Sequence, residues 1–310
     1  MRILITGGTG LIGRALAHNL AAAKHEVIIL TRDPEWVVGM PEAIRAVRWD
    51  GKTAHGWGEL ADGAGAIINL AGQSIAGESL PDILFTRWSK TYKERILNSR
   101  LNAGKAVTEA ITAAKNKPAL LLQASAVGFY GPRAAEPVDE STPAGSDFLA
   151  QVCQQWEQST QSVEALGVRR IILRTGLVLA PKGGILPIMA LPFRLFAGGP
   201  IGSGKQYIPW IHLQDEIGAI EFLLKHPQAS GVYNLTAPQP LTNADFGRAL
   251  GRALFRPAFF PTPAFALKLA LGEKSTLVLD GQNAIPTRLQ AQGYKFKFSD
   301  AYSALTDLLR

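Results

Sequence analysis

The chain opens with Met1-Arg-Ile-Leu-Ile-Thr-Gly-Gly-Thr-Gly-Leu-Ile-Gly13, and this stretch decides the fold. Residues 3–5 form an apolar run that is too short for a helix and is soon followed by glycine, which predicts a buried strand. Residues 14–23 have helical composition, with Leu16 and Leu20 on one face. The stretch therefore predicts a strand, a glycine turn and a helix.

The glycines of this turn are spaced as in sites that bind dinucleotides. Gly8, Gly10 and Gly13 fit one fingerprint, and Gly7, Gly10 and Gly13 fit a variant of it. One glycine permits the tight turn, one lets a pyrophosphate approach the backbone, and one lets the helix pack on the strand. The helix N-terminus then offers N–H groups to the phosphates. We expect a dinucleotide site here; the alternative is a glycine-rich turn without a ligand.

Composition bounds the class of protein. The chain has 310 residues, of which 47% are hydrophobic and 18% charged, so we expect a globular protein of one large or two small domains. No apolar stretch is long enough to cross a bilayer, and the N-terminus predicts a strand and not a signal peptide. Cys153 is the sole cysteine, which excludes an internal disulfide. We expect a cytoplasmic protein with no membrane partner.

The net charge of +7 raises the question of nucleic acid. The basic residues are scattered, without a run of five or six like charges, so no nucleic-acid partner is expected. A solvated surface and contacts to an anionic cofactor account for the excess.

The end of the second expected strand, residues 25–31, indicates which cofactor binds. Folds that bind NAD place an acidic residue there for the ribose, whereas folds that bind NADP use an arginine for the 2′-phosphate. This chain reads Thr31-Arg32-Asp33, which favours NADP(H). Asp33 either pairs with Arg32 or caps the turn that follows. The alternative for Arg32 is that it is an exposed loop residue without a cofactor contact.

Further strands alternate with helices, which predicts an α/β fold: a Rossmann doubly wound parallel sheet with helices on both faces. The expected strands are 44–50, 66–70, 120–125 and 170–174, and the expected helices are 91–114 and 148–166. Residues 74–90 look irregular. The alternation breaks near residue 180, where proline and glycine become frequent. We therefore expect an NADP-binding domain over 1–180 and a small substrate lobe over 181–310, with some segments returning to the first domain.

The carboxyl ends of three segments should meet at Ala71, Ser125 and Val178. Open α/β sheets bind ligands at this edge, so a nicotinamide ring is expected among them. A hydroxyl such as that of Ser125 is well placed there to hydrogen-bond a carbonyl substrate.

Motifs along the whole chain resemble an atypical extended short-chain dehydrogenase/reductase of the "epimerase family protein" subgroup, with a DUF1731-type C-terminus. They are Ile-Thr-Gly-Gly-Thr-Gly-Leu-Ile-Gly, Leu-Thr-Arg-Asp-Pro, Ile-Asn-Leu-Ala-Gly, Lys-Glu-Arg-Ile-Leu-Asn-Ser-Arg, Ser-Ala-Val-Gly-Phe-Tyr-Gly, Leu-Arg-Thr-Gly-Leu-Val-Leu-Ala, Gly-Gly-Pro-Ile-Gly-Ser-Gly-Lys-Gln-Tyr and Pro-Trp-Ile-His-Leu. The resemblance implies a Rossmann domain that binds NADP(H). The cofactor-binding residues expected from turn and resemblance together are Gly7, Thr9, Gly10, Leu11, Ile12, Gly13, Thr31, Arg32, Leu70, Ala71, Gly72, Arg95, Arg100 and Val178.

One departure from the superfamily limits the chemistry. Active members use a tyrosine with a lysine four residues on, helped by a serine. Ser125 is kept, but with Glu157 as the register mark the other two positions fall near Leu149 and Cys153. We expect Ser125 to be catalytic and Tyr130 to be the substitute proton donor.

Each substitute has a structural alternative. Tyr130 is otherwise a packing residue in a tight turn, His212 is more often structural than catalytic, and Cys153 is otherwise a buried helix cysteine. Two classes of function follow. The first is an NADP-dependent oxidoreductase or nucleotide-sugar-type epimerase, and the second is a non-catalytic NADP(H)-binding sensor or partner module. The substrate, a small molecule, and the oligomeric state stay open, and no metal site is expected.

Overall fold

The structure is a computed structural model that describes residues 1–37, 39–77 and 79–310, and within these seven strands form one parallel sheet. The strand order is β11-β7-β5-β4-β1-β2-β3. The bounds are β1 Arg2–Thr6, β2 Glu26–Thr31, β3 Ile44–Arg48, β4 Ala66–Asn69, β5 Leu120–Ala126, β7 Arg169–Thr175 and β11 Gly231–Leu235. The chain runs outward from β1 to β3 and then crosses to β4 on the other side of β1. The loops that follow β1 and β4 therefore meet at the switch point, where open sheets bind ligands.

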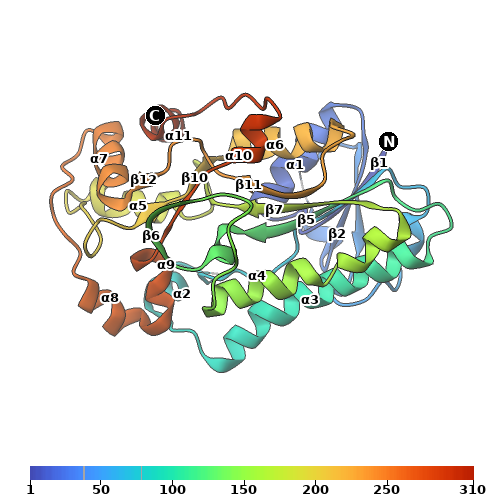
Figure 1. The fold of residues 1–310 in the computed structure, drawn as a ribbon, viewed down its shortest axis with the longest axis horizontal. Helices are drawn as coiled ribbons and strands as arrows, with labels where there is room; N and C mark the ends of the chain where they lie inside the picture. The colour runs from blue at the N-terminus through green and yellow to red at the C-terminus, as the bar shows by residue number, and fades with distance from the viewer. Residues whose placement is uncertain (38, 78) are drawn as a thin grey trace.

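Helices cover both faces of the sheet, as expected for a doubly wound fold (Figure 1). Helices α1 (Leu11–Ala22) and α6 (Leu213–Lys225) pack on one face, and α3 (Lys90–Ala113) and α4 (Phe148–Gln158) lie on the other. Alternate residues of β1 serve the two layers: Ile3 and Ile5 point to the α1 side, and Leu4 points to the α3 side. The predicted fold class is thus confirmed.

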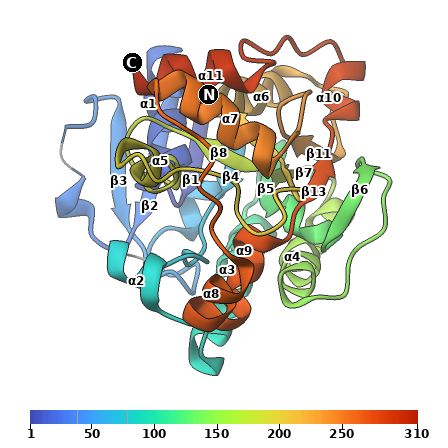
Figure 2. The same ribbon diagram turned by 90° about the vertical axis from the view of Figure 1, so that its left-hand side faces the viewer.

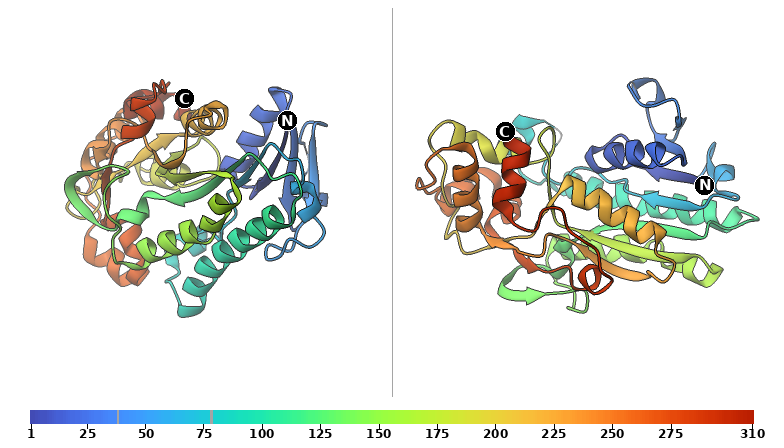
Figure 3. Two further views of the ribbon diagram at one scale, coloured as in Figure 1. Left: turned by 45° about the vertical axis from the view of Figure 1, so that its right-hand side comes forward. Right: turned by 90° about the horizontal axis from the view of Figure 1, so that it is seen from above.

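The remaining elements build the edge of the sheet and the C-terminal region. They are η1 Pro34–Trp36, η2 Gly58–Ala61, α2 Leu80–Phe85, η3 Val127–Tyr130, β6 Arg133–Val138, η4 Gln161–Leu166, β8 Leu177–Leu179, α5 Leu186–Arg194, β9 Tyr207–Ile208, β10 Trp210–His212, β12 Leu241–Thr242, α7 Asn243–Leu254, α8 Ala264–Leu271, η5 Gly272–Ser275, α9 Thr276–Leu279, β13 Gln282–Ala284, α10 Thr287–Ala291 and α11 Ala301–Leu309. Helices α5, α7 and α11 share a hydrophobic cluster of their own, away from the sheet (Figures 2 and 3).

Two expectations about helices need correction. The segment 74–90, expected to be irregular, contains α2, because Ser79 and Asp82 form a capping box at its start. The expected helix 148–166 is split into α4 and η4. Ser159 follows α4, and its hydroxyl donates to the Trp156 carbonyl, which competes with continuation of the helix.

The chain does not leave the sheet for good at residue 180. Strand β11 pairs with β7 in parallel, and α6 covers the same face as α1. Residues 213–235 therefore belong to the sheet layer, whereas α5 before them and α7 after them belong to the C-terminal cluster. Thr242 begins α7 as expected, since its hydroxyl accepts the Asp245 N–H at 3.2 Å.

Candidate functional site

The glycine turn after β1 shows a separate reason for three of its four glycines. Gly7 has a φ of +68°, and a Cβ there would lie 2.9 Å from the Leu70 carbonyl carbon. A Cβ on Gly13 would lie 2.3 Å from the Gly7 oxygen, so this glycine lets α1 pack on the turn. Around Gly10, by contrast, a Cβ would meet just the Gly7 oxygen, at 3.3 Å, among the described atoms. The open side of Gly10 is where a pyrophosphate can approach the backbone.

Helix α1 begins at this opening with its first N–H groups available. Gly10 is the N-cap, and in the described structure no side chain caps this end and no acidic residue lies in the first turn. The N–H groups of Leu11, Ile12 and Gly13 therefore lack intrahelical acceptors, and the helix dipole favours an anion. Thr9 is exposed at the rim of the turn. This end of the site has the chemistry that a dinucleotide phosphate requires.

The β2 end presents Arg32 to solvent. Its side chain forms no hydrogen bond or ion pair within the described part of the chain, whereas its carbonyl accepts from Arg48 at 2.9 Å. Arg48 also forms an ion pair with Glu35 at 2.8 Å, which holds the loop. Asp33 neither pairs with Arg32 nor makes a capping bond with its side chain, both residues being in the described region. Its N–H donates to the Thr31 hydroxyl instead. The guanidinium of Arg32 is thus free to meet an anion.

The loop after β4 is fixed beside the glycine turn by one hydroxyl. Thr6, at the end of β1, donates to Asn69 at 2.6 Å and accepts the N–H groups of Leu70 and Ala71 at 3.1 and 3.2 Å. A Cβ on Gly72 would lie 3.1 Å from Arg100 Cζ, so the loop also packs on α3. The expected cofactor path from the turn to residues 70–72 is therefore continuous.

The two candidate arginines of α3 point in different directions. Arg100 lines a cavity, donates to the carbonyls of Gln73 and Ile96 at 3.0 and 2.9 Å, and lies over the Trp156 ring. Burial lowers the pKa of its guanidinium. Arg95 is exposed and stacks over Tyr92. Of the two, Arg100 has the position to approach a bound ligand.

A cavity of about 500 Å³ lies between the sheet edge and the C-terminal region. Its sheet side includes Arg100, Ala126, Val127, Gly128 and the segment Thr175, Gly176 and Leu177, and α4 contributes Leu149, Val152, Cys153 and Trp156. Helices α2, α5, α7 and α8 close the other sides. Val178 follows on β8, and the next loop reaches α1, because a Cβ on Gly184 would lie 3.0 Å from the Leu11 side chain. The cavity thus lies next to the expected cofactor residues Arg100 and Val178.

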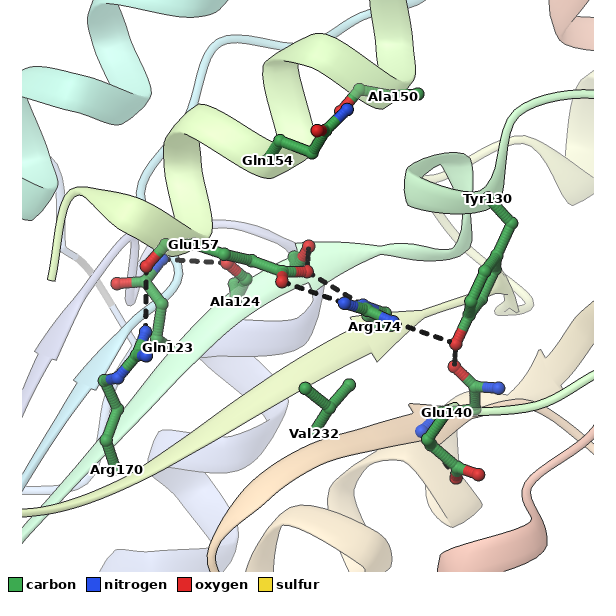
Figure 4. Close-up of polar contacts among 12 residues, drawn as sticks. Gln123, Ala124, Tyr130, Glu140, Ala150, Gln154, Glu157, Arg170, Arg174 and Val232 are labelled. Atoms are coloured by element: carbon green, nitrogen blue, oxygen red, sulfur yellow. Dashed lines mark hydrogen bonds and ion pairs between the residues drawn. The ribbon is translucent and has the colours of Figure 1, made fainter. Parts of the chain in front are cut away.

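Ser125 belongs to a buried polar network beside this cavity. Its hydroxyl donates to Glu157 at 2.7 Å, and Glu157 forms a two-pronged ion pair with Arg174 at 2.9 and 3.0 Å. Arg174 also donates to the Tyr130 hydroxyl at 3.2 Å, which in turn donates to Asn234 at 2.7 Å (Figure 4). Burial acts to lower the pKa of Arg174, but the contacts with Glu157 outweigh it and raise that pKa.

The hydroxyls of both expected catalytic residues, Ser125 and Tyr130, form hydrogen bonds within this network. Ser125 is 3% exposed and Tyr130 is fully buried, and neither borders the cavity in the region that the structure describes. Burial raises the pKa of the Tyr130 phenol. For Tyr130 the geometry favours the packing alternative. Ser125 keeps its position at the end of β5, but its proton is directed to Glu157. The sequence motifs do not predict this network. Its one local signal is Arg174, a charged residue at the end of the apolar run of β7.

The positions that would carry a Tyr-Lys pair, Leu149 and Cys153, both line the cavity. Burial raises the pKa of the Cys153 thiol to about 11, and the Glu157 carboxylate acts in the same direction. The thiol therefore stays protonated at neutral pH and is a weak nucleophile. These two side chains present an apolar wall where a proton relay would stand.

His212 has a structural position. It is the N-cap of α6, where Nδ1 accepts the Gln214 N–H at 3.0 Å, and its ring stacks on Phe298. Nε2 lies 3.3 Å from Asp307, and burial lowers the pKa of the ring. Within the described residues, no cluster of histidine, cysteine or carboxylate side chains could hold a metal ion, and no helix is both long and apolar enough to span a bilayer.

Glu216, in the first turn of α6, carries a testable pH dependence. Its Oε1 accepts the Thr175 hydroxyl at 2.9 Å, and burial raises its pKa from 4.5 to about 8. Between these values the folded protein binds a proton that the unfolded chain releases, so stability falls as pH rises from about 4.5 through about 8. Glu216→Gln should remove this loss. In urea unfolding, we expect the variant to gain on the order of 2–4 kcal/mol relative to the parent between pH 5 and pH 9.

The exposed Glu94 provides the matched control, because Glu94→Gln should leave the pH profile of stability unchanged. Parallel profiles for the parent and Glu216→Gln would show that Glu216 is ionised in the folded protein.

Comparisons with known proteins agree along the whole chain. The model for the NAD dependent epimerase/dehydratase family matches residues 3–236, and a domain of unknown function, DUF1731, matches residues 262–308. "Epimerase family protein YfhF" of Bacillus subtilis is 38% identical over 310 residues, covering 100% of this chain and 98% of the relative. "Epimerase family protein SDR39U1" of Mus musculus is 35% identical over 315 residues, with both chains covered completely.

Solved structures show the same relationship. The crystal structure of human epimerase family protein SDR39U1 with NADPH has a TM-score of 0.86 and 35% identity and covers 99% of each chain. The Thermus thermophilus UDP-glucose 4-epimerase complex with NAD has a TM-score of 0.74 at 19% identity over 99% of this chain and 98% of that one, and so shows the fold alone. The resemblance read from the sequence motifs is confirmed.

Proposed function

This chain belongs to the NAD dependent epimerase/dehydratase family, and we propose that it is an NADP(H)-dependent enzyme, an oxidoreductase or an epimerase acting on a small molecule. The observation that carries the proposal is the switch point of the sheet. There the open side of Gly10, the loop held by Thr6 and Arg32, which has no side-chain partner among the described residues, follow β1, β4 and β2, and a cavity of about 500 Å³ borders the ends of β5 and β7. A sensor module would not require a substrate-sized cavity beside the cofactor path.

Different residues of this site would bind different parts of the cofactor. The N–H groups at the start of α1 would hold the pyrophosphate, and Arg32 with Thr31 would meet the 2′-phosphate. Leu70 and Ala71 would line the route to the nicotinamide, which we place near Ala126 and Val178. The human relative crystallised with NADPH supports this choice of cofactor. When bound, NADP(H) supplies the hydride donor or acceptor, and this chain positions it against the cavity.

The catalytic role of the chain's own side chains differs from the usual Tyr-Lys arrangement. Because the Ser125 hydroxyl donates its hydrogen bond to Glu157, its lone pairs remain available to accept a hydrogen bond from a neighbour. Ser125 therefore acts as a positioning residue at the end of β5. Acceleration would come mainly from holding the two reactants together in the cavity.

Substitution of Arg32 tests the cofactor assignment. Arg32→Ala should weaken NADPH binding by roughly tenfold to a hundredfold, since a charge-assisted contact to the 2′-phosphate is lost, and NADH binding should stay nearly unchanged. Fluorescence titration of both cofactors measures the difference.

Arg45 on β3 is exposed and is a suitable control, because Arg45→Ala removes the same charge without touching the cofactor path. An equal loss for NADPH and NADH in Arg32→Ala, or an equal NADPH loss in both variants, would remove Arg32 from the site.

A further inference from the structure

We propose that the cavity beside the cofactor path takes an uncharged, predominantly apolar carbonyl or alcohol compound, and not a sugar joined to a nucleoside diphosphate. The inference rests on the proposed NADP(H)-dependent function and names the class of its substrate. It follows from three features of the cavity wall: its apolar side chains, the sign of its charges, and the engagement of its polar groups.

The wall is apolar on every side that the structure describes. Leu84 comes from α2, Leu149 and Trp156 from α4, Ile188 and Phe193 from α5, and Leu271 from α8. These side chains belong to four helices around one space, so a molecule at its centre meets hydrocarbon in most directions. Burial of apolar ligand surface against such a wall is the main driving force for binding.

The charges of the wall disfavour an anion. Among the described lining residues, three are charged: Arg100, Asp147 and Asp280. Arg100 is the cation of the three; its Nη1 donates to two backbone carbonyls and its guanidinium stacks on Trp156, so Nε and Nη2 are the donors left to a ligand in the described structure. Burial raises the pKa of Asp280, and the Asp147 carboxylate nearby adds to this effect. A diphosphate would need several free cationic donors and would instead face two acids.

The other usual anion binders are helix N-termini, and two of those at this cavity already carry an acidic residue at the cap or in the first turn. Asp147 caps α4 and accepts the Ala150 N–H at 3.2 Å. At α7, the Thr242 hydroxyl accepts the Asp245 N–H, and Asp245 adds a negative charge to the first turn. Helices α5 and α8 have no side-chain cap among the described residues; α5 begins two residues after Gly184, which packs on Leu11 at the cofactor side.

Each amide side chain of the wall uses one of its two ends for a hydrogen bond within the fold. Asn243 accepts the Ile201 N–H, Gln206 donates to the Ile201 and Val278 carbonyls, and Gln282 donates to the Gly131 carbonyl. A sugar ring with several hydroxyls would find few partners here, and each unmatched hydroxyl would be desolvated at a cost. Tyr207 and Thr262 line the cavity with hydroxyls that are unpaired in the described structure, which suits a substrate with few oxygens.

A competition experiment on the NADPH-loaded protein tests the proposal. Nile red is a neutral, apolar dye whose fluorescence rises in apolar surroundings, and it should bind saturably. A medium-chain ketone such as nonanone should displace it, whereas UDP-glucose at millimolar concentration should not. NADPH binding is measured in parallel, so that failure of the cofactor site is distinguished from failure of the substrate class.

A second test places a charged side chain in the cavity wall and compares it with the same charge on the exposed side of the same helix. Ile188→Lys on α5 should lower Nile red affinity by about tenfold or more, because the ammonium would be desolvated in the occupied cavity. Leu191→Lys is the control, since Leu191 lies on the same helix, is 40% exposed and is not among the described lining residues. Both variants should keep NADPH affinity and the midpoint of thermal unfolding.

Each outcome of the competition experiment and of the lysine variants supports or overturns the proposed substrate class. Displacement of Nile red by UDP-glucose, saturable UDP-glucose binding to the loaded protein, or an equal loss in both lysine variants would overturn the proposal. If Ile188→Lys does not fold, Ile188→Gln and the competition on the parent protein give the answer. Selective displacement by the ketone, with loss confined to residue 188, supports an apolar substrate.

Discussion

Replacing Gly10 with valine is expected to abolish NADPH binding, with a loss of roughly a hundredfold or more, while the protein stays folded. A Cβ at this position would make one tight contact, with the Gly7 oxygen at 3.3 Å, and would otherwise meet open space among the described atoms. The branched side chain would instead stand where the pyrophosphate approaches the backbone. Titration with NADPH measures the loss, and circular dichroism with thermal unfolding monitors the fold.

Gly13→Val is the informative contrast. A Cβ on Gly13 would lie 2.3 Å from the Gly7 oxygen and 2.7 Å from the Gly8 Cα, so this substitution should destabilise the turn itself. The two variants therefore separate a glycine needed for the ligand from a glycine needed for packing. Unchanged NADPH affinity in folded Gly10→Val would place the cofactor elsewhere.

Removal of one partner of the Glu157–Arg174 ion pair should cost about 3–5 kcal/mol of unfolding free energy. The side chains are 13% and 5% exposed, so Arg174→Met would leave a buried carboxylate with the Ser125 hydroxyl as its remaining partner. Tyr130 would lose a donor in the same variant. Urea unfolding measures the change without the ionic screening that guanidinium would add.

The double variant Glu157→Leu with Arg174→Met should recover much of this loss, because no buried charge is then left unpaired. The exposed pair of Arg48 and Glu35 is the control, and Arg48→Met should shift the urea midpoint little. Additive losses in the Glu157 and Arg174 variants would mean that the two groups do not act as a pair.

The sheet was predictable because its signals are local. Residues 1–13 carry a strand, a turn and a helix in one short stretch, and the apolar runs of the other strands are equally plain. The cofactor residues follow from the same logic, since strand ends in a parallel sheet converge on one edge. The roles of the predicted cofactor-binding and catalytic residues stay predictions.

The cavity and the network around Ser125 were not predictable in this way. The network joins residues 125, 157, 174 and 234. They are brought together because β5, β7 and β11 pair side by side and α4 packs on this part of the sheet. Neither Asp147 nor Asp280 has a distinctive sequence context, and they come together through the packing of segments 133 residues apart in the chain (280 minus 147). Such contacts depend on tertiary structure and leave little local signal.

The return of β11 to the sheet limits how this protein can be divided or recombined. The chain enters the C-terminal cluster with α5, leaves it to complete the sheet and enters it again with α7. A fragment ending near residue 180 would expose the edge of β7, with Ile171 and Leu173 no longer covered, and unpaired apolar edges promote aggregation. An exchange of substrate lobes between relatives must therefore transfer separate inserts around residues 213–235 and leave α10 with the sheet, because Leu289 of α10 packs in the sheet cluster. Grafting experiments and gene fusions can be designed with junctions on either side of residues 213–235.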